Sequence, residues 1–185
     1  IVINELVDNM VKVKGGTVDG VTFSDFYIGK YEITNEEYDA VMDERPVYRL
    51  IFAQLGGAEA YNNKLRIKNE AAMDKKHHPK IVSRKQVLVF LERLNEKTGK
   101  QYRLPTDLEW EVAAKGGICG HGYKYSGGND ILGVANFYNG KKTNLEDVGQ
   151  KRPNELGLYD MTGNVDELCD NACIDINDKR WSVRG

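Results

Sequence analysis

The clearest pattern along the chain is an apolar stripe at helical spacing. Val87, Phe90, Leu91 and Leu94 fall at positions i, i+3, i+4 and i+7, which places their side chains on one face of an α-helix. Gly99 follows the stripe, and glycine commonly ends a helix because it adopts the left-handed conformation without steric cost. The pattern therefore predicts a helix that buries its apolar face and ends just before Gly99.

Three short strings have the composition of a capping box, in which two side chains satisfy each other's free backbone amides. They are residues 34–37 (TNEE), 83–86 (SRKQ) and 106–109 (TDLE). Because plausible helical sequence follows each of them, we predict three helix starts. The last of these helices runs through Trp110 to Ala114 and is ended by the glycine pair that follows.

Strand signals are short, and irregular sequence is extensive. Residues 10–13 predict one strand, and the alternation over residues 23–33 predicts one or two more. From about residue 117 to 154, Gly, Asn, Lys and Tyr predominate without periodicity. Such a coil needs packing or a bound ion to hold it in a compact domain. We interpret residues 45–76 as an insertion in a single domain that spans residues 1–185.

Composition and charge exclude several classes of protein. The chain of 185 residues is long enough to bury its own core, and no apolar run approaches the roughly 20 residues of a membrane helix. Its 26 basic and 28 acidic residues give a net charge of −2. A basic band over residues 64–103, with net charge +8, is typical of a solvated helix face and loop. We therefore expect neither a membrane span nor a nucleic-acid partner.

The three cysteines, Cys119, Cys169 and Cys173, are too few for a disulfide scaffold. Cys169 and Cys173 lie four residues apart, and free thiols, a disulfide and a metal site all remain open for them. A zinc site that combines Cys119 and His121 with the distant upstream histidines fits no closed four-ligand spacing. Zinc is therefore not predicted.

Four ordered strings are far more specific than periodicity. They are residues 11–17 (VKVKGGT), 25–35 (DFYIGKYEITN), 98–111 (TGKQYRLPTDLEWE) and 153–165 (PNELGLYDMTGNV). In this order they resemble the formylglycine-generating enzyme (sulfatase-modifying factor) family. The resemblance implies an α+β, C-type-lectin-like fold with a small twisted antiparallel sheet, two main helices and extensive irregular coil. Within that fold, Arg103, Glu109 and Glu111 are expected to form a buried or half-buried polar network rather than a catalytic site.

The chain departs from the family where the enzyme's chemistry resides. The resemblance implies oxidation of a sulfatase cysteine with copper and dioxygen, by paired cysteines downstream of an Arg-Gly-Gly block. This sequence stops inside that block at Gly185, and a thiolate-bound copper(I) site needs two positioned sulfurs. The family's Gly-Asn-x-Trp-Glu-Trp string is here residues 163–168 (GNVDEL), which lack both tryptophans. We expect an altered groove, no copper in this chain and no formylglycine formation by it as written.

The same string resembles a calcium site of the family, and calcium takes oxygen ligands. The predicted ligands are Gly163, Asn164, Val165 and Glu167. Asn164 and Glu167 would supply side-chain oxygens, and the other two would supply backbone carbonyls. Asp166 either adds a ligand or points to solvent, and a capped loop without an ion is the alternative. The family's other calcium site would involve Asn136.

These observations favour a non-catalytic module that binds a protein, peptide or glycan ligand on a formylglycine-generating-enzyme-like scaffold. We expect it in a bacterial cell envelope or secreted protein, with the loops of its second half as the working surface. A related form is a diversified receptor-type protein on this fold. The alternative is a formylglycine-generating oxidase whose C-terminal catalytic segment is missing from this sequence. An iron-dependent relative is a third interpretation, but it needs a histidine cluster from an additional helical domain.

Overall fold

The structure of the protein is a computed structural model that describes residues 2–42, 76–137, 145–170 and 182–185. Its elements follow in the order α1 (Val2–Asp8), β1 (Met10–Val13), β2 (Gly16–Val18), β3 (Val21–Phe23), β4 (Phe26–Gly29), α2 (Asn35–Met42), α5 (Arg84–Thr98), α6 (Asp107–Ala114), η1 (Gly117–Cys119), α7 (Ile131–Val134), β5 (Glu167–Cys169) and β6 (Ser182–Arg184). Helices and small antiparallel sheets are mixed, so the predicted α+β class is confirmed.

The strands of the described residues form three two-stranded antiparallel sheets, which pair β1 with β4, β2 with β3, and β5 with β6. The strand predicted over residues 10–13 is confirmed as β1. Of the one or two strands predicted over residues 23–33, the structure forms β4 and the last residue of β3. The chain leaves the sheet after Gly29, and its backbone then hydrogen-bonds to residues 78–80. This departure carries the segment away from the sheet and into the start of α2.

All three predicted helix starts are confirmed. At α2, the Thr34 amide donates to the Glu37 carboxylate (2.8 Å), and the Glu37 amide donates back to the Thr34 hydroxyl (3.2 Å). Thr106 and Glu109 make the same reciprocal pair at α6 (2.8 and 3.1 Å). The capping box of residues 83–86 precedes α5. This helix ends where predicted, because Gly99 takes a left-handed φ of 67°. Local sequence therefore fixes the positions of these helices.

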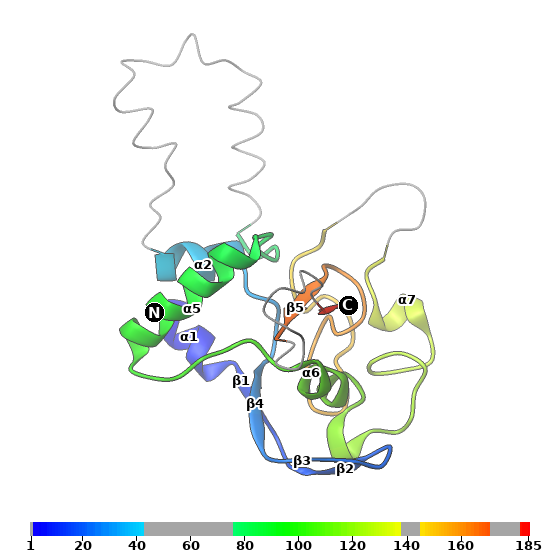
Figure 1. The fold of residues 1–185 in the computed structure, drawn as a ribbon. Coiled ribbons are helices and arrows are strands. Elements are labelled where there is room, and N and C mark those ends of the chain that lie inside the picture. The colour runs from blue at the N-terminus through cyan, green and yellow to red at the C-terminus, as the bar shows by residue number, and fades with distance from the viewer. Residues whose placement is uncertain (1, 43–75, 138–144, 171–181) are drawn as a thin grey trace, which may run out of the picture.

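Helices α1, α2 and α5 pack together on one side of β4 (Figure 1). The core that they share, here called the helical cluster, is made of Leu6, Tyr38, Val41, Met42, Phe90 and Leu94. Phe90 and Leu94 of the predicted stripe are buried, and Val87 and Leu91 are partly buried. The sequence pattern does not predict α1, because this short helix has no capping string and depends on burial of Leu6 for its place.

A second core lies on the other side of β4, where α6 packs against the coil of residues 145–170 (Figure 1). Its buried members are Val13, Phe26, Trp110, Val112, Ala113, Leu158, Met161 and Cys169. Asn154 joins the coil to α6, because its amide donates to the Ala113 carbonyl (2.8 Å) and accepts from the Leu156 and Leu158 amides (3.0 and 3.2 Å). The long irregular coil predicted after residue 117 is confirmed in its described parts, which contain only η1 and α7.

The polar network predicted within residues 98–111 is present in part, and it lies nearer the surface than expected. Arg103 donates to both carboxylate oxygens of Glu109 at 2.7 Å. The Arg103 side chain is 58% exposed, whereas that of Glu109 is 16% exposed. Glu111 lies apart from this pair and bonds Lys115 at 2.8 Å. The Arg103–Glu109 pair thus supports the start of α6, since Glu109 also caps it.

The predictions made for Cys173 and for the insertion over residues 45–76 fall outside the described residues. Of the insertion, the structure describes residue 76 alone. The assignment of residues 1–185 to one domain stays a prediction. None of the helices in the described part of the chain has the length and apolar character that a bilayer crossing requires.

Candidate functional site

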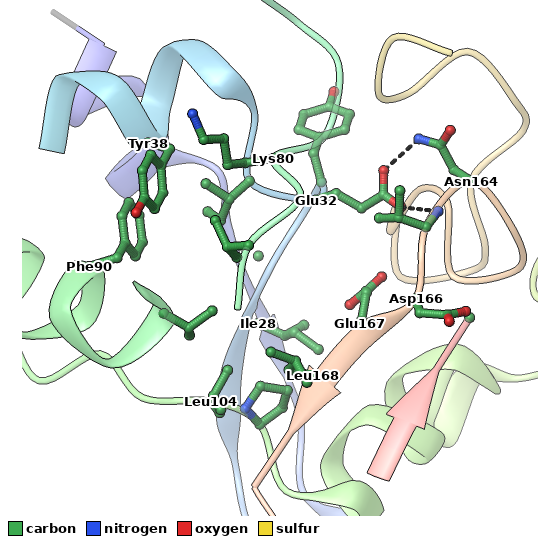
Figure 2. Close-up of a pocket in the computed structure, with 18 of the residues that line it drawn as sticks. Ile28, Glu32, Tyr38, Lys80, Phe90, Leu104, Asn164, Asp166, Glu167 and Leu168 are labelled. Atoms are coloured by element: carbon green, nitrogen blue, oxygen red, sulfur yellow. Dashed lines mark hydrogen bonds between the residues drawn. The ribbon is translucent and has the colours of Figure 1, made fainter. Parts of the chain in front are cut away.

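A cavity of about 1040 Å³ lies between the helical cluster and strand β5 (Figure 2). Its walls are largely apolar and come from segments far apart in the sequence. The apolar lining includes Ile28, Phe90, Leu94, Leu104, Met161 and Leu168. A concave apolar surface with a few polar groups at one end is the usual form of a ligand site. This cavity, here called the pocket, is therefore the candidate functional site.

Glu32 lies at the polar end of the pocket, where the chain runs from β4 into α2, and only 8% of it is exposed. The Asn164 side-chain amide donates to one carboxylate oxygen (2.6 Å), and the Val165 backbone N–H donates to the other (3.1 Å). Burial, together with the nearby charge of Glu167, raises the pKa of Glu32 to about 8. The two N–H donors oppose this rise because they favour the ionised carboxylate.

Glu167, the first residue of β5, lies at the same part of the pocket (Figure 2). The indole N–H of Trp110 in α6 donates to its carboxylate at 2.9 Å. Trp110 is itself 6% exposed, so this hydrogen bond is made inside the protein. Burial raises the pKa of Glu167 to about 7, although the Trp110 hydrogen bond acts in the opposite direction.

Asp160 is a second buried carboxyl group of this region, with 5% of its surface exposed, whereas Glu167 is half-buried. It has a left-handed φ of 57° and accepts a hydrogen bond from the Gly149 N–H at 2.7 Å. Burial raises its pKa too, and its charge raises the pKa of both Glu32 and Glu167. Among the described residues, neither Glu32 nor Glu167 forms a salt bridge. Among the described residues, the polar end of the pocket therefore gathers three acidic groups, Glu32, Asp160 and Glu167.

The structure brings the predicted calcium residues together at the edge of the pocket. Gly163, Asn164, Val165 and Glu167 all line it. Asn136, which sequence assigns to another calcium site, lies against them, since its carbonyl accepts from the Asn164 N–H at 2.7 Å. Gly163 is required here because its φ is 86° and an added Cβ would lie 2.1 Å from the Asn136 carbonyl oxygen.

The contacts of these residues agree only in part with a calcium site. Trp110 bonds one of the two carboxylate oxygens of Glu167. The side-chain oxygen of Asn164, in contrast, already accepts from the Asn136 side-chain amide (3.1 Å) and from the Glu146 N–H (3.2 Å). Among the described residues, no group of three or more His, Cys, Asp or Glu side chains is placed to hold a metal ion. Calcium stays a prediction, with Glu167 as its best-placed side chain.

The two described cysteines do not fit a copper(I) site. Cys169 in β5 is a free thiol with no exposed surface, and burial raises its pKa to about 12. Copper(I) binds the thiolate, which this environment disfavours at neutral pH. Cys119 is a free, exposed thiol in η1. The described residues thus offer no pair of positioned thiolates.

Sequence reasoning nominates neither Glu32 nor Asp160. For Glu32 a weak signal exists, because it stands between Tyr31 and Ile33 and shares the strand-period position of Phe26 and Ile28. Asp160 has no comparable signal. Its burial depends on how the coil packs, and periodicity does not report on coil.

Residues 4–182 match the Sulfatase-modifying factor enzyme 1-like domain, and the chain belongs to this family. The resemblance predicted from the four strings is confirmed. The chain is 33% identical over 199 residues to the Chaperone protein LppX of Paenibacillus barcinonensis, covering 88% of this chain and 71% of that protein. It is 36% identical over 81 residues to the Formylglycine-generating enzyme of Streptomyces coelicolor, covering 36% of this chain and 25% of the enzyme.

Two solved structures share the fold. CarF superposes with a TM-score of 0.65 at 23% identity, covering 88% of this chain and 80% of CarF. Treponema denticola variable protein 1 superposes with a TM-score of 0.61 at 24% identity, covering 86% of this chain and 71% of that protein. At these identities the likeness concerns the fold alone, and the formylglycine-generating-enzyme type of C-type-lectin-like fold is confirmed.

Proposed function

We propose that this domain is a non-catalytic binding module that holds a segment of another polypeptide in the pocket. The observation that carries the proposal is the pocket itself, a cavity of about 1040 Å³ with apolar walls and an acidic end. A polypeptide client, rather than a glycan, is supported by the relative named Chaperone protein LppX, which aligns with 88% of this chain. Apolar walls of this kind suit exposed apolar side chains of an unfolded segment.

The apolar walls can supply the affinity that such a module needs. Burial of one Leu- or Phe-sized side chain contributes about 1.5–3 kcal/mol. Three such client side chains contribute roughly 5–9 kcal/mol, which is comparable with the ~4–15 kcal/mol that association costs in lost freedom. A segment of several residues is therefore the smallest client that the pocket would retain.

The described cysteines take no part in the pocket. Cys169 is a buried structural thiol, and Cys119 lies apart from it on an exposed turn. A buried thiol with a raised pKa is inert rather than nucleophilic. The pocket has, in addition, no described cysteine among the residues that line it.

A matched pair of substitutions tests the proposal. Leu104→Asp places a carboxylate on the apolar wall of the pocket, whereas Leu108→Asp makes the same change on α6, outside the pocket lining, where Leu108 is 39% exposed. In a light-scattering assay with chemically denatured citrate synthase, the wild-type domain and Leu108→Asp should suppress aggregation equally. Leu104→Asp should need about tenfold more protein for the same effect, equivalent to about 1.4 kcal/mol.

Circular dichroism establishes that both variants are folded before the assay. Absence of suppression by the wild-type domain, or equal suppression by a folded Leu104→Asp variant, contradicts the proposal.

We infer that the module works in the cell envelope or outside the cell. The support is the expectation that follows from membership of this family. Fractionation of the native host followed by immunodetection tests the inference, and recovery in the cytoplasmic fraction alone would count against it.

A further inference from the structure

We propose that His78 and Asp147 form a pH-sensitive latch that regulates how tightly the pocket holds its client. This inference rests on the proposed function, because it concerns regulation of the same pocket. The latch fastens residues 145–149, here called the strap, which form neither helix nor strand and are all half-buried. The latch closes at acidic pH and loosens as the pH rises, so the client is held more tightly below neutral pH than above it.

The latch joins the strap to the helical side of the molecule. His78 is fixed to the start of α2, because its carbonyl accepts from the Asn35 N–H at 3.0 Å. Its side chain is 14% exposed, and the ring Nδ1 lies 2.7 Å from Oδ1 of Asp147 in the strap. Beside this pair, the Val148 N–H donates to the His77 carbonyl at 3.0 Å. A side-chain pair and a neighbouring backbone hydrogen bond thus attach the strap at this point.

The other end of the strap supports a wall of the pocket. Gly149 packs so closely on Tyr31 that an added Cβ would lie 2.8 Å from the Tyr31 ring. Tyr31 stacks on Tyr159 with ring centres 5.0 Å apart, and both tyrosines line the pocket. The Gly149 N–H also donates to the Asp160 carboxylate at 2.7 Å. Movement of the strap would therefore remove the support behind the two rings, and the wall that they form would lose its fixed shape.

The pH response follows from the chemistry of histidine, which exchanges its proton between about pH 5 and 8. A protonated His78 forms an ion pair with Asp147, whereas a neutral ring retains only a neutral hydrogen bond, which is roughly half as strong. The latch is therefore strongest at acidic pH and weakens as the pH rises. An irregular segment with half-buried side chains opens at a low cost in free energy. Loss of one ion pair then changes how often the strap is open.

The other titratable groups near the latch are engaged differently. The acidic side chains of α2 are held by other partners: Glu36 by Lys76 and His77, Glu37 by Thr34, and Asp39 by Lys80. On the coil, burial raises the pKa of Asp160, as does the charge of Glu146, whereas Lys151 lowers it. Ionisation of Asp160 strengthens its bond to Gly149 as the pH rises. Asp160 therefore acts on the strap in the opposite direction to His78, and substitution of His78 separates the two effects.

Hydrogen–deuterium exchange of the free domain tests the latch itself. The wild type is compared with His78→Gln and with the matched control His77→Gln, whose side chain is 54% exposed. After correction for the intrinsic pH dependence of exchange, the Val148 and Gly149 amides of wild type and control should be about threefold more protected at about pH 5.5 than at about pH 8. His78→Gln should remove this difference. Asp147→Asn, which changes the 44% exposed partner, should remove it as well.

A binding measurement then tests whether the latch regulates the pocket. The probe is fluorescently labelled lactalbumin, kept unfolded by reduction and carboxymethylation, and fluorescence anisotropy gives its dissociation constant. At about pH 5.5, the wild type and His77→Gln should bind the probe about threefold more tightly than His78→Gln does. At about pH 8 the three proteins should bind it equally. Comparison at one pH cancels the change in charge of the probe.

Several outcomes would overturn the inference, and they separate it from the proposed function. Strap protection that does not change with pH in the wild type, or a change that survives in His78→Gln and Asp147→Asn, rules out the latch. Equal binding of the probe by wild type and His78→Gln at acidic pH rules out regulation, while the proposed function stands. Failure of the probe to bind at either pH, together with absence of aggregation suppression, removes the proposed function as well. Because two variants open the latch from opposite sides, misfolding of one leaves the test intact.

Discussion

The two sides of β4 are stabilised in different ways. The helical cluster on one side is built almost wholly from apolar side chains. Two of its helices, α2 and α5, begin at capping boxes, and α5 ends at Gly99. On the other side, the coil of residues 145–170 is held by single polar side chains that reach across the molecule. Asn154 bonds α6, and Asn164 bonds Glu32, which lies 132 positions away in the sequence. The pocket lies where these two regions meet, with an apolar wall from one and an acidic end from the other.

This difference shows how a family scaffold can change its function. Packing of the helical cluster depends on volume and leaves little room for variation. The segment of residues 145–170, in contrast, presents Glu167, whose pKa is set by its burial and by its neighbours Trp110 and Asp160. Function on this fold is therefore expected to reside in the coil. If the two regions are stabilised differently, the helical cluster should be most sensitive to loss of apolar volume. The coil should be most sensitive to loss of single polar side chains.

The largest expected effect is in the helical cluster. Leu94 is 2% exposed, and Leu94→Ala leaves a cavity as well as removing apolar burial. We expect the free energy of unfolding to fall by about 3 kcal/mol. Leu88 on the same helix is 49% exposed and is the control, since Leu88→Ala should change stability by less than about 0.5 kcal/mol. Urea denaturation followed by circular dichroism measures both, and similar values for the two variants would refute the assigned packing.

A comparable loss on the coil side should come from one polar side chain. Asn154→Ala removes the bonds to the Ala113 carbonyl and to the Leu158 amide in a buried setting. Backbone groups left unsatisfied in the interior cost about 1–3 kcal/mol, and we expect a loss of about 2 kcal/mol. Amide hydrogen exchange should accelerate in residues 153–161 while α5 keeps its protection. Uniform acceleration across both regions would mean that they are not stabilised separately.

The next expected effect is a pH dependence that belongs to the acidic end of the pocket. The pKa values of Glu32 and Glu167 are raised in the folded state to about 8 and about 7. The folded protein therefore binds more protons than the unfolded chain between about pH 4.5 and 8, and stability falls as pH rises through this window. Glu167→Gln removes one of these groups and should make the fall smaller by roughly 2 kcal/mol. Melting temperatures from pH 5 to 8 measure it, and a stability that rises across this window would contradict the assignment.

The smallest expected effect concerns calcium. If Glu167 binds the ion as predicted, calcium at about ten times its dissociation constant stabilises the folded state by about 1.4 kcal/mol. Differential scanning fluorimetry with calcium or EDTA measures this, and Glu167→Gln should abolish the response. Magnesium is the control ion, because it tolerates irregular oxygen ligand sets poorly. A response that Glu167→Gln leaves intact would place calcium elsewhere or assign the effect to ionic strength.

Sequence alone predicts much more of one region than of the other. The helix of residues 84–98 follows from a stripe, a capping box and Gly99, all within one short stretch. The acidic end of the pocket requires Glu32 to meet Asn164 and Glu167, and no local pattern reports contacts across such separations. The family strings brought Asn164 and Glu167 to notice as candidate ligands, but not Glu32. The partners of Glu32 depend on how the coil folds, and a coil sequence has no hydrophobic periodicity from which its contacts could be predicted.

The measurement that tests the central claim most directly is hydrogen–deuterium exchange of the wild-type domain with and without an unstructured apolar peptide. If the client lies in the pocket, the amides of Gly29 and Leu168, which line it, should exchange more slowly in the complex. Residues 131–134 of α7, which do not line the pocket, should be unchanged. Protection confined to other surfaces, or no protection at saturating peptide, would contradict a client-binding pocket at this position.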